Sequence, residues 1–335
     1  MKAITHIVCG VALLVSCWLA VSPAAAGVDV LIEGDAKEQS EISITTIPGQ
    51  PGKLVMAYND DTTAALGLGI AHRQSAGGAW TTLQLPIPTV PALPGPPSMT
   101  WIFDPTITAD NAGNVYAGFI GGGASSWPGP PFAWPDSGMY VSVSPAGSYG
   151  QAWNTPVQVA YDPAPTANPD PAYRFNDRCQ IVADNVSAGS FAGNVYVSWI
   201  KDRGFQSGLM SDIYFATSAD QGMTYTYPAP QAAGELIIND NPGTDLANIP
   251  VPAVAPNGTV WVSWLDYNVV GGGVGKIYVD KSTDAGLNWG TDKLVTTINL
   301  PPINVTTKVP PAQDALAKDG TPIAVSPLNS NHLYI

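Results

Sequence analysis

The stretch STDAGLNW, residues 282–289, decides the fold because its pattern of serine, aspartate, glycine and aromatic residue returns along the chain. One copy is close and two are weaker, and they align by their glycine and aromatic positions: SADQGMTY (218–225), AGSYGQAW (146–153) and RQSAGGAW (73–80). The aligned glycines are separated by 73, 72 and 64 residues: Gly77, Gly150, Gly222 and Gly286. A period near 70 indicates a repeated unit, and it is too short for sandwich domains of about 100 residues each.

A predicted β-hairpin accompanies each copy. Its second strand follows a Gly-containing turn, in GKLVMAYND (52–60), GNVYAGFIG (113–121), GNVYVSWIKD (193–202) and GTVWVSWLDY (258–267). Its first strand is short, in ISITT (42–46), TITAD (106–110), QIVAD (180–184) and VPAVA (251–255). Large side chains on both faces, as in 195–199, suit a sheet packed between two others. We therefore predict an all-β propeller of four-stranded blades.

The S-x-D-x-G-x-x-W string resembles the Asp-box, or BNR repeat, of the sialidase (neuraminidase) superfamily, over residues 40–335. We expect the Asp to accept backbone hydrogen bonds in a tight turn, the Gly to adopt a positive φ and the aromatic ring to pack between blades. The structural positions are Ser218, Asp220, Gly222, Tyr225, Ser282, Asp284, Gly286 and Trp289. In the weaker copies Ser75 and Ser148 occupy the Asp position and are expected to cap less strongly.

The resemblance implies six blades, whereas the sequence shows four and the start of a fifth. That start is PIAVSPLNSNHLYI (322–335), which repeats the first hairpin of a blade. We therefore expect the propeller domain, 27–335, to be C-terminally incomplete. Residues 28–32 are a candidate closing strand.

Residues 1–26 have the order of a secretory signal peptide: a basic start, an apolar stretch from 4 to 21, and Ala24–Ala26 as a cleavage pattern. We predict a secreted or periplasmic protein with no transmembrane segment in its mature chain. A lipoprotein box ending at Cys17 is the alternative, and the apolar residues that follow Cys17 disfavour it. The predicted mature chain retains only Cys179, so no internal disulfide is expected.

Composition narrows the classes of partner. Charged residues make up 12% of the chain, with 34 glycines and 32 prolines, which excludes a coiled coil. The formal net charge of −13 argues against nucleic acid and anionic membranes. A neutral ligand, a cell-surface ligand or a bound cation remains compatible with it.

Antiparallel blades place every Asp-box turn on one face and the long loops on the other, where binding sites usually lie. Those loops carry aromatic residues that can stack on sugar rings: Trp101, Trp127, Trp134 and Tyr173. Packing of the loops onto the scaffold is the alternative role for each of them.

Charged residues are expected on the same face, near the axis. Glu41, Asp104 and Arg178 align just before the first strands, with Asp177 beside Arg178. The second strands are followed by Asp60, Asp61, Asp202, Arg203 and Asp266. This acidic floor with two arginines can bind a sugar, bind Ca²⁺ through carboxylate oxygens, or be solvated loop charge.

The resemblance also implies an arginine triad for a carboxylate sugar, a Tyr nucleophile assisted by a Glu, and an acid/base Asp. The family's Arg-Ile-Pro motif is missing, and SEISI (40–44) stands in its place. Arg73 falls on the Asp-box face. Arg174, Arg178 and Arg203 come from one blade and its entry loop rather than from several blades. Sialoside hydrolysis is therefore the minority interpretation.

Three functions remain open. The favoured one is a secreted propeller that binds glycans or another extracellular ligand on its loop face. The second is a glycoside hydrolase acting through Asp104, Asp202 and Asp266, and the third is a protein-interaction scaffold. No cofactor is required for any of them, and the sequence leaves a Ca²⁺ requirement open.

Overall fold

A computed structural model describes the chain at residues 39–60, 67–87, 99, 101–122, 136–163, 174–202, 211–226, 236–240, 247–266, 273–300 and 322–335. All of these belong to one compact unit, Ile32–Ile335. The predicted signal peptide and the candidate closing strand at 28–32 lie outside the described residues. Within the described part of the chain, no helix has both the length and the apolar character needed to cross a membrane.

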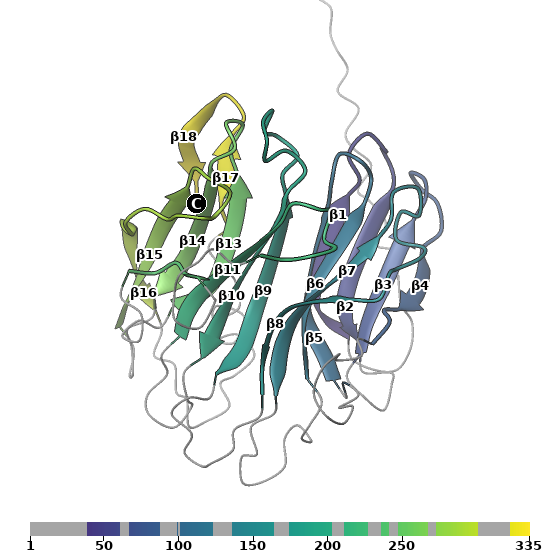
Figure 1. Cartoon of the computed structure of the whole chain (residues 1–335). Helices are drawn as coiled ribbons and strands as arrows, with labels where there is room; N and C mark the ends of the chain where they lie inside the picture. Colours follow the sequence, from purple (N-terminus) through teal and green to yellow (C-terminus); the bar gives the residue numbers. More distant parts are fainter. Residues whose placement is uncertain are drawn as a thin grey trace, which may run out of the picture. The chain divides into compact units, whose positions relative to one another are not determined.

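The described residues form four four-stranded antiparallel sheets, as predicted, and one two-stranded sheet (Figure 1). The first sheet has the order β1 (Gln39–Thr46), β2 (Leu54–Asp60), β3 (Gly67–Arg73), β4 (Thr81–Gln84). The second is β5 (Trp101–Ala109), β6 (Val115–Gly122), β7 (Ser137–Ser144), β8 (Val157–Asp162). The third is β9 (Phe175–Ala183), β10 (Val195–Asp202), β11 (Ser211–Ser218), β12 (Leu236–Ile237), and the fourth is β13 (Ala247–Val254), β14 (Val260–Asp266), β15 (Gly273–Ser282), β16 (Lys293–Leu300).

A fifth, two-stranded sheet follows, in the segment predicted to begin another blade. It is the hairpin of β17 (Ala324–Ser326) and β18 (Asn329–Tyr334). Val325 and Leu333 pack against Trp261 of the fourth sheet, and the Trp261 indole N–H donates to the Ser330 carbonyl at 3.2 Å. The hairpin therefore continues the stacking of one sheet on the next.

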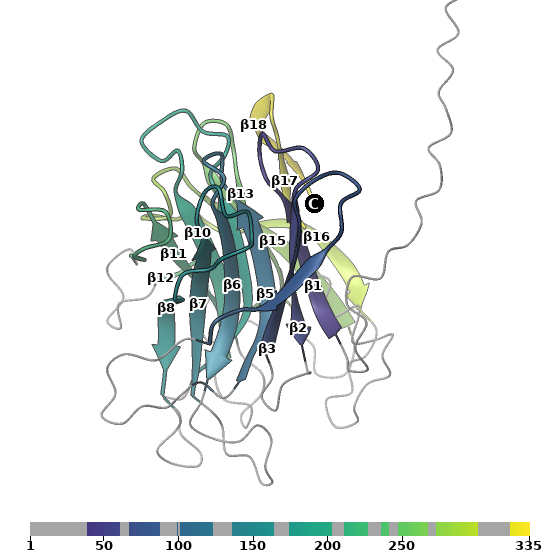
Figure 2. The same cartoon turned by 90° about the vertical axis from the view of Figure 1, so that its right-hand side faces the viewer.

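The first strand of each sheet lies next to the first strand of the following sheet, in the succession β1, β5, β9, β13 (Figure 1). Figure 2 turns the side of the first sheet toward the viewer. Core residues fill the spaces between sheets, so β6, β10 and β14 are buried on both faces, whereas β2 keeps half-buried positions. In β10, Tyr196 packs with the fourth sheet's residues and Trp199 with the second sheet's, and each is fully buried. This burial explains the large side chains on both faces of the strand.

The hairpin turns contain glycines with a left-handed backbone: Gly52, Gly113, Gly193 and Gly258, with φ between 82° and 92°. In the turn after β15, the Asp284 carboxylate accepts from the Asn288 backbone N–H at 2.9 Å and from its side-chain amide at 2.7 Å. The Gly286 N–H donates to Ser282 Oγ at 2.8 Å. The Asp220 turn has the same bonds to Thr224.

The weaker copy in the second sheet keeps part of this network. Ser148 Oγ accepts one backbone bond, from Ala152 at 2.8 Å. The Gly150 N–H is accepted by Ser144 Oγ at 2.9 Å, six residues earlier instead of four. Sequence alignment overlooked Ser144 because two extra residues separate it from the glycine.

Candidate functional site

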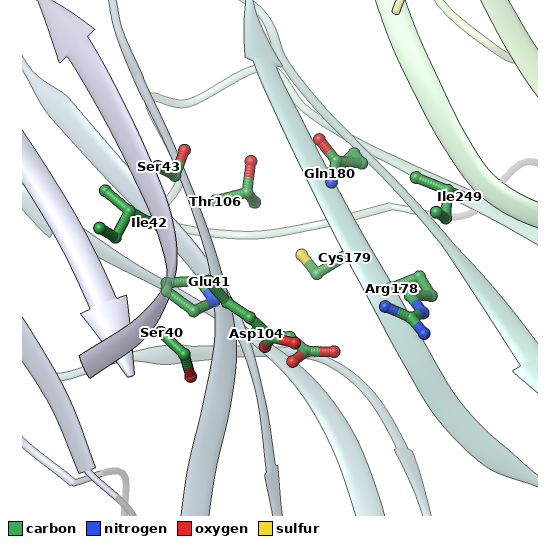
Figure 3. A pocket seen from close by; sticks show the side chains of 11 residues that line it. Ser40, Glu41, Ile42, Ser43, Asp104, Thr106, Arg178, Cys179, Gln180 and Ile249 are labelled. Carbon is green, nitrogen blue, oxygen red and sulfur yellow. The ribbon is translucent and has the colours of Figure 1, made fainter. Parts of the chain in front are cut away.

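The first strands of the four sheets line an open pocket of about 540 Å³, which we call the axial pocket (Figure 3). Each of β1, β5, β9 and β13 contributes to it. Its lining residues are Ser40, Glu41, Ile42, Ser43, Asp104, Pro105, Thr106, Arg178, Cys179, Gln180 and Ile249. The pocket lies near the beginnings of these strands, at the end opposite the turns that carry Asp220 and Asp284.

A β-bulge interrupts every one of the four lining strands. In each, two residues stand opposite one residue of the neighbouring strand. The first bulge residue has a left-handed backbone, with φ of 54°, 54°, 58° and 48° for Glu41, Asp104, Arg178 and Ile249. Such conformations are costly outside glycine and concentrate at functional sites, where bulges re-aim side chains.

A buried aromatic residue stands opposite each bulge: Tyr58, Phe119, Trp199 and Trp264. The sequence placed the three charged residues just before the strands. They lie inside the strands, because the bulge breaks the alternation that marks a strand and makes its start look later. The aromatic residue repeated at this position is a signal that could have revealed the bulge.

The carboxyl groups of Asp104 and Glu41 meet in the pocket and are hydrogen-bonded to each other (Figure 3). Burial, this hydrogen bond and the negative charges of Asp177 and Glu41 raise the pKa of Asp104 to about 10, with Arg178 opposing them. Two adjacent carboxyl groups cannot both ionise cheaply, so the pair retains a proton at neutral pH. Asp104 can then donate a hydrogen bond or a proton to a ligand.

Arg178 acts electrostatically on Asp104 and on a third carboxyl group, that of Asp202. Arg178 is on the opposite side of the pocket, and its Nε lies 3.7 Å from Asp177 Oδ2. Burial and the charge of Asp177 raise the pKa of Asp202 to about 8, again opposed by Arg178. The region around Arg178 therefore contains two carboxyl groups, Asp104 and Asp202, that favour their protonated forms.

The structure places the other candidate residues differently. Asp60 and Asp266 end β2 and β14, are buried and do not line the pocket, and Gln84 Nε2 donates to Asp60. Trp101 is 3% exposed and stacks on Phe103 with ring centroids 4.9 Å apart, which is a packing contact. Trp127, Trp134, Tyr173, Arg203 and Asp61 lie outside the described residues.

Two candidate features have limited support among the described residues. No group of three or more His, Cys, Asp or Glu side chains there is arranged to hold a metal ion, so the Ca²⁺ expectation gains no geometric support from them. Arg178 is also the one arginine of the described segments that lines the axial pocket, so these segments assemble no arginine triad.

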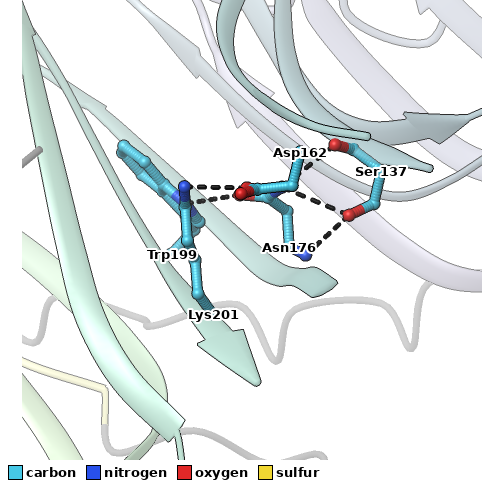
Figure 4. A network of polar contacts seen from close by, with 5 residues as sticks. All are labelled: Ser137, Asp162, Asn176, Trp199 and Lys201. Carbon is cyan, nitrogen blue, oxygen red and sulfur yellow. Dashed lines mark hydrogen bonds and ion pairs between the residues drawn. The ribbon is translucent and has the colours of Figure 1, made fainter. Parts of the chain in front are cut away.

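A buried polar network joins the second and third sheets beside the pocket (Figure 4). Lys201 Nζ lies 2.8 Å from Asp162 Oδ2, and Asn176 donates to the same oxygen at 2.8 Å. Asn176 also bonds Ser137 and accepts from the Trp199 indole N–H at 2.9 Å. Because Trp199 stands opposite the Arg178 bulge, the network fixes the wall that carries Arg178.

No family profile and no curated protein match this chain. Solved structures with a similar arrangement include a protein of unknown function from Dyadobacter fermentans, at 15% identity and a TM-score of 0.49, covering 76% of this chain and 68% of that one. An α-L-arabinanase from Penicillium chrysogenum complexed with arabinobiose has 12% identity and a TM-score of 0.48, with 76% and 66% covered. An α-L-arabinofuranosidase from Fusarium graminearum in complex with an iminosugar inhibitor has 12% identity and a TM-score of 0.49, covering 77% of this chain and 69% of that one.

The chain thus spans about two thirds of the length of these structures, none of which is named as a sialidase. At such low identity and TM-score, they assign no activity. Fold and site define the class: an all-β repeat protein of four-stranded propeller blades, with a polar pocket between the first strands of its sheets.

Proposed function

We propose that the chain is a secreted propeller protein that binds a saccharide in the axial pocket. The observation that supports this most is the convergence of Glu41, Asp104 and Arg178, from three different sheets, on one cavity. All three side chains are carried by strained bulge residues at equivalent positions of the repeat. The bulge itself does not require a charged residue, because the equivalent bulge residue of the fourth sheet is Ile249.

The pocket chemistry suits a polyhydroxylated ligand. The carboxyl pair supplies both a donor and acceptors, and the Arg178 guanidinium supplies further donors. Hydroxyl and amide groups of Ser43, Thr106 and Gln180 extend this set. Ile42 and Ile249 add apolar surface for the C–H faces of a sugar ring. Such a mixture of apolar walls and a few convergent polar groups is typical of small-molecule sites.

A glycan array tests the proposal. The wild-type protein should bind a defined set of saccharides, and Asp104→Asn and Arg178→Gln should each reduce that binding at least about tenfold, or ~1.4 kcal/mol. Lys293→Gln, which removes a charge from exposed β16, is the matched control and should bind as the wild type does. Unchanged binding in both pocket variants would overturn the proposal.

A glycoside hydrolase is the second candidate, and one observation favours it. Asp104 and Asp202 hold protons at or near neutral pH beside ionisable partners, as a general acid must. Release from fluorogenic neutral glycosides and sialosides tests this candidate, with Asp104→Asn, Asp202→Asn and Asp266→Asn compared. Turnover lost in the first two but retained in Asp266→Asn would assign the acid chemistry to the carboxyl groups around Arg178.

The scaffold alternative predicts binding to a protein rather than to glycans. Trp127→Ala and Trp134→Ala separate a ligand held by the loops from one held in the axial pocket, because only a loop-bound ligand should lose affinity in these variants. Array binding that is sensitive to the tryptophans but insensitive to Asp104→Asn would move the site onto the loops.

We also propose export with cleavage after Ala26. Intact mass of the exported protein decides this, since a lipoprotein processed at Cys17 would begin there and carry acyl chains.

A further inference from the structure

Asn59, on β2, connects the two carboxyl residues of the axial pocket. Its Nδ2 donates to Glu41 Oε2 at 2.8 Å, and its Oδ1 accepts from the Asp104 backbone N–H at 2.9 Å. Only one orientation of the amide satisfies both bonds, because the carboxylate accepts and the backbone N–H donates. Asn59 thereby joins the first sheet to the second at the point where the carboxyl groups meet.

The repeat shows that asparagine is exceptional at this position. Asn59 pairs with Ser40, one residue before the bulge, and the equivalent residues of the other sheets are Ile120, Ile200 and Leu265. All three are buried aliphatic side chains. The fold therefore accepts an aliphatic residue at this position. Only the first sheet has a polar residue there, and that residue contacts the carboxyl pair. A half-buried amide is costly unless its hydrogen bonds are used.

We propose that Asn59 is a positioning residue that holds Glu41 as the acceptor of the pair and leaves the shared proton on Asp104. An N–H donor to one carboxyl group favours its ionised form. The inference rests on the proposed function in one respect: the proton on Asp104 serves the ligand only if the pocket binds one. The other groups facing Asp104 are Asp177, Arg178 and Cys179, all on β9.

The first test uses the ligand-free protein and is independent of binding. In ¹³C NMR at neutral pH, Asn59→Leu and Asn59→Ala should move the Asp104 carboxyl carbon toward its ionised shift and the Glu41 carboxyl carbon toward its protonated shift. Asn59→Leu copies the residue found in the fourth sheet, and Asn59→Ala avoids any steric conflict. Asn111→Ala, which removes an exposed asparagine bonded to the Asn185 carbonyl, should leave both signals unchanged. Wild-type carboxyl signals in both Asn59 variants would overturn the inference.

The second test uses saccharides that the array identifies. Asn59→Leu should weaken their binding about tenfold and shift its pH profile, while a merely structural role would leave the profile in place. If Asp104→Asn weakens binding but Asn59→Leu alters neither binding nor the carboxyl signals, the positioning role fails and the proposed function stands. If the carboxyl signals move but Asp104→Asn and Arg178→Gln both bind as the wild type does, the proposed function fails and the positioning role stands.

Discussion

Glu41 and Asp104 belong to different sheets, yet their carboxyl groups are hydrogen-bonded to each other. Each is the first residue of a β-bulge and has a φ of 54°. The repeat therefore brings equivalent positions of neighbouring blades into contact, and the residues chosen at those positions determine the chemistry of the pocket. The same repeated bulge that shapes the first strands thus also brings together the side chains of the axial pocket.

The carboxyl pair predicts how stability depends on pH. The pKa of Asp104 is raised from 3.8 to about 10, so between these values the folded protein holds a proton that the unfolded chain has lost. The protonated Asp104 therefore contributes its full stabilisation below the unfolded-state pKa of 3.8, and this contribution is lost as the pH rises toward the folded-state pKa of about 10. Asp104→Asn, which resembles the protonated acid, should show a flatter decline in the free energy of unfolding from about pH 5 to about pH 9.

Urea unfolding at a series of pH values measures this decline. Lys293→Gln serves as the control and should keep the wild-type slope. A wild-type slope in Asp104→Asn as well would show that Asp104 titrates as an ordinary carboxyl group.

Alanine substitutions at two glycines of the repeated turns should lower the free energy of unfolding by different amounts. Gly286 has a φ of 86°, and a Cβ there would overlap the Phe215 ring of the preceding sheet. Gly77 has a φ of 70° but has open space around a Cβ. Gly77→Ala should cost about 1 kcal/mol from the backbone alone, and Gly286→Ala about 2–4 kcal/mol from backbone and overpacking together. Equal losses in chemical denaturation would contradict this account of the turn.

Replacing Asp284, which lies in the turn after β15 and does not line the axial pocket, should lower stability without weakening ligand binding. Burial opposes ionisation of Asp284, but bonds from Asn288, Ser282 and Leu287 hold its pKa below the usual value. Its contribution is therefore present at neutral pH and lost as pH falls through that lowered pKa. Asp284→Ala should cost about 1–2 kcal/mol at neutral pH. Ser148→Ala removes only the two exposed bonds that its hydroxyl makes with the Ala152 backbone, so it should cost less than Asp284→Ala. The reverse order in thermal or urea unfolding would be inconsistent with the turn geometry.

The two partners of the ion pair between the second and third sheets differ in burial, so removing one should destabilise the protein more than removing the other. The Lys201 side chain is 2% exposed and that of Asp162 is 20% exposed. Asp162→Asn leaves a buried cation without its carboxylate and should cost about 3 kcal/mol or more, whereas Lys201→Met leaves a partly solvated carboxylate that keeps Asn176. Unfolding measurements should rank Asp162→Asn as the more damaging change, and the opposite ranking would contradict this description of the network.

The sequence predicted the sheets well because the repeat has redundant signals. A turn glycine followed by a largely buried second strand recurs in every four-stranded sheet, so the hairpin of β17 and β18 was predicted from the same pattern. The predicted first strands began too late in every sheet, since the bulge at Glu41, Asp104, Arg178 and Ile249 interrupts the alternation.

The site was predictable only in part. Alignment of the repeat brought Glu41, Asp104 and Arg178 to one position, and the structure gathers them in the axial pocket. Asn59 was missed because its role depends on a contact between two sheets, which no local pattern encodes. Asp266 was expected on the same face with the other residues that follow the second strands, but it is not among the lining residues of the pocket, because alignment along a strand does not reveal which way a side chain points.

The central claim is that ligands bind in the axial pocket, and methyl NMR tests it most directly in the unmodified protein. Ile42 and Ile249 line the pocket from β1 and β13, whereas Leu328 is 95% exposed in the β17–β18 hairpin. Titration with a saccharide identified on the array should shift the Ile42 and Ile249 methyl signals and leave that of Leu328 in place. Saturable binding that leaves both isoleucine signals unmoved would contradict the claim.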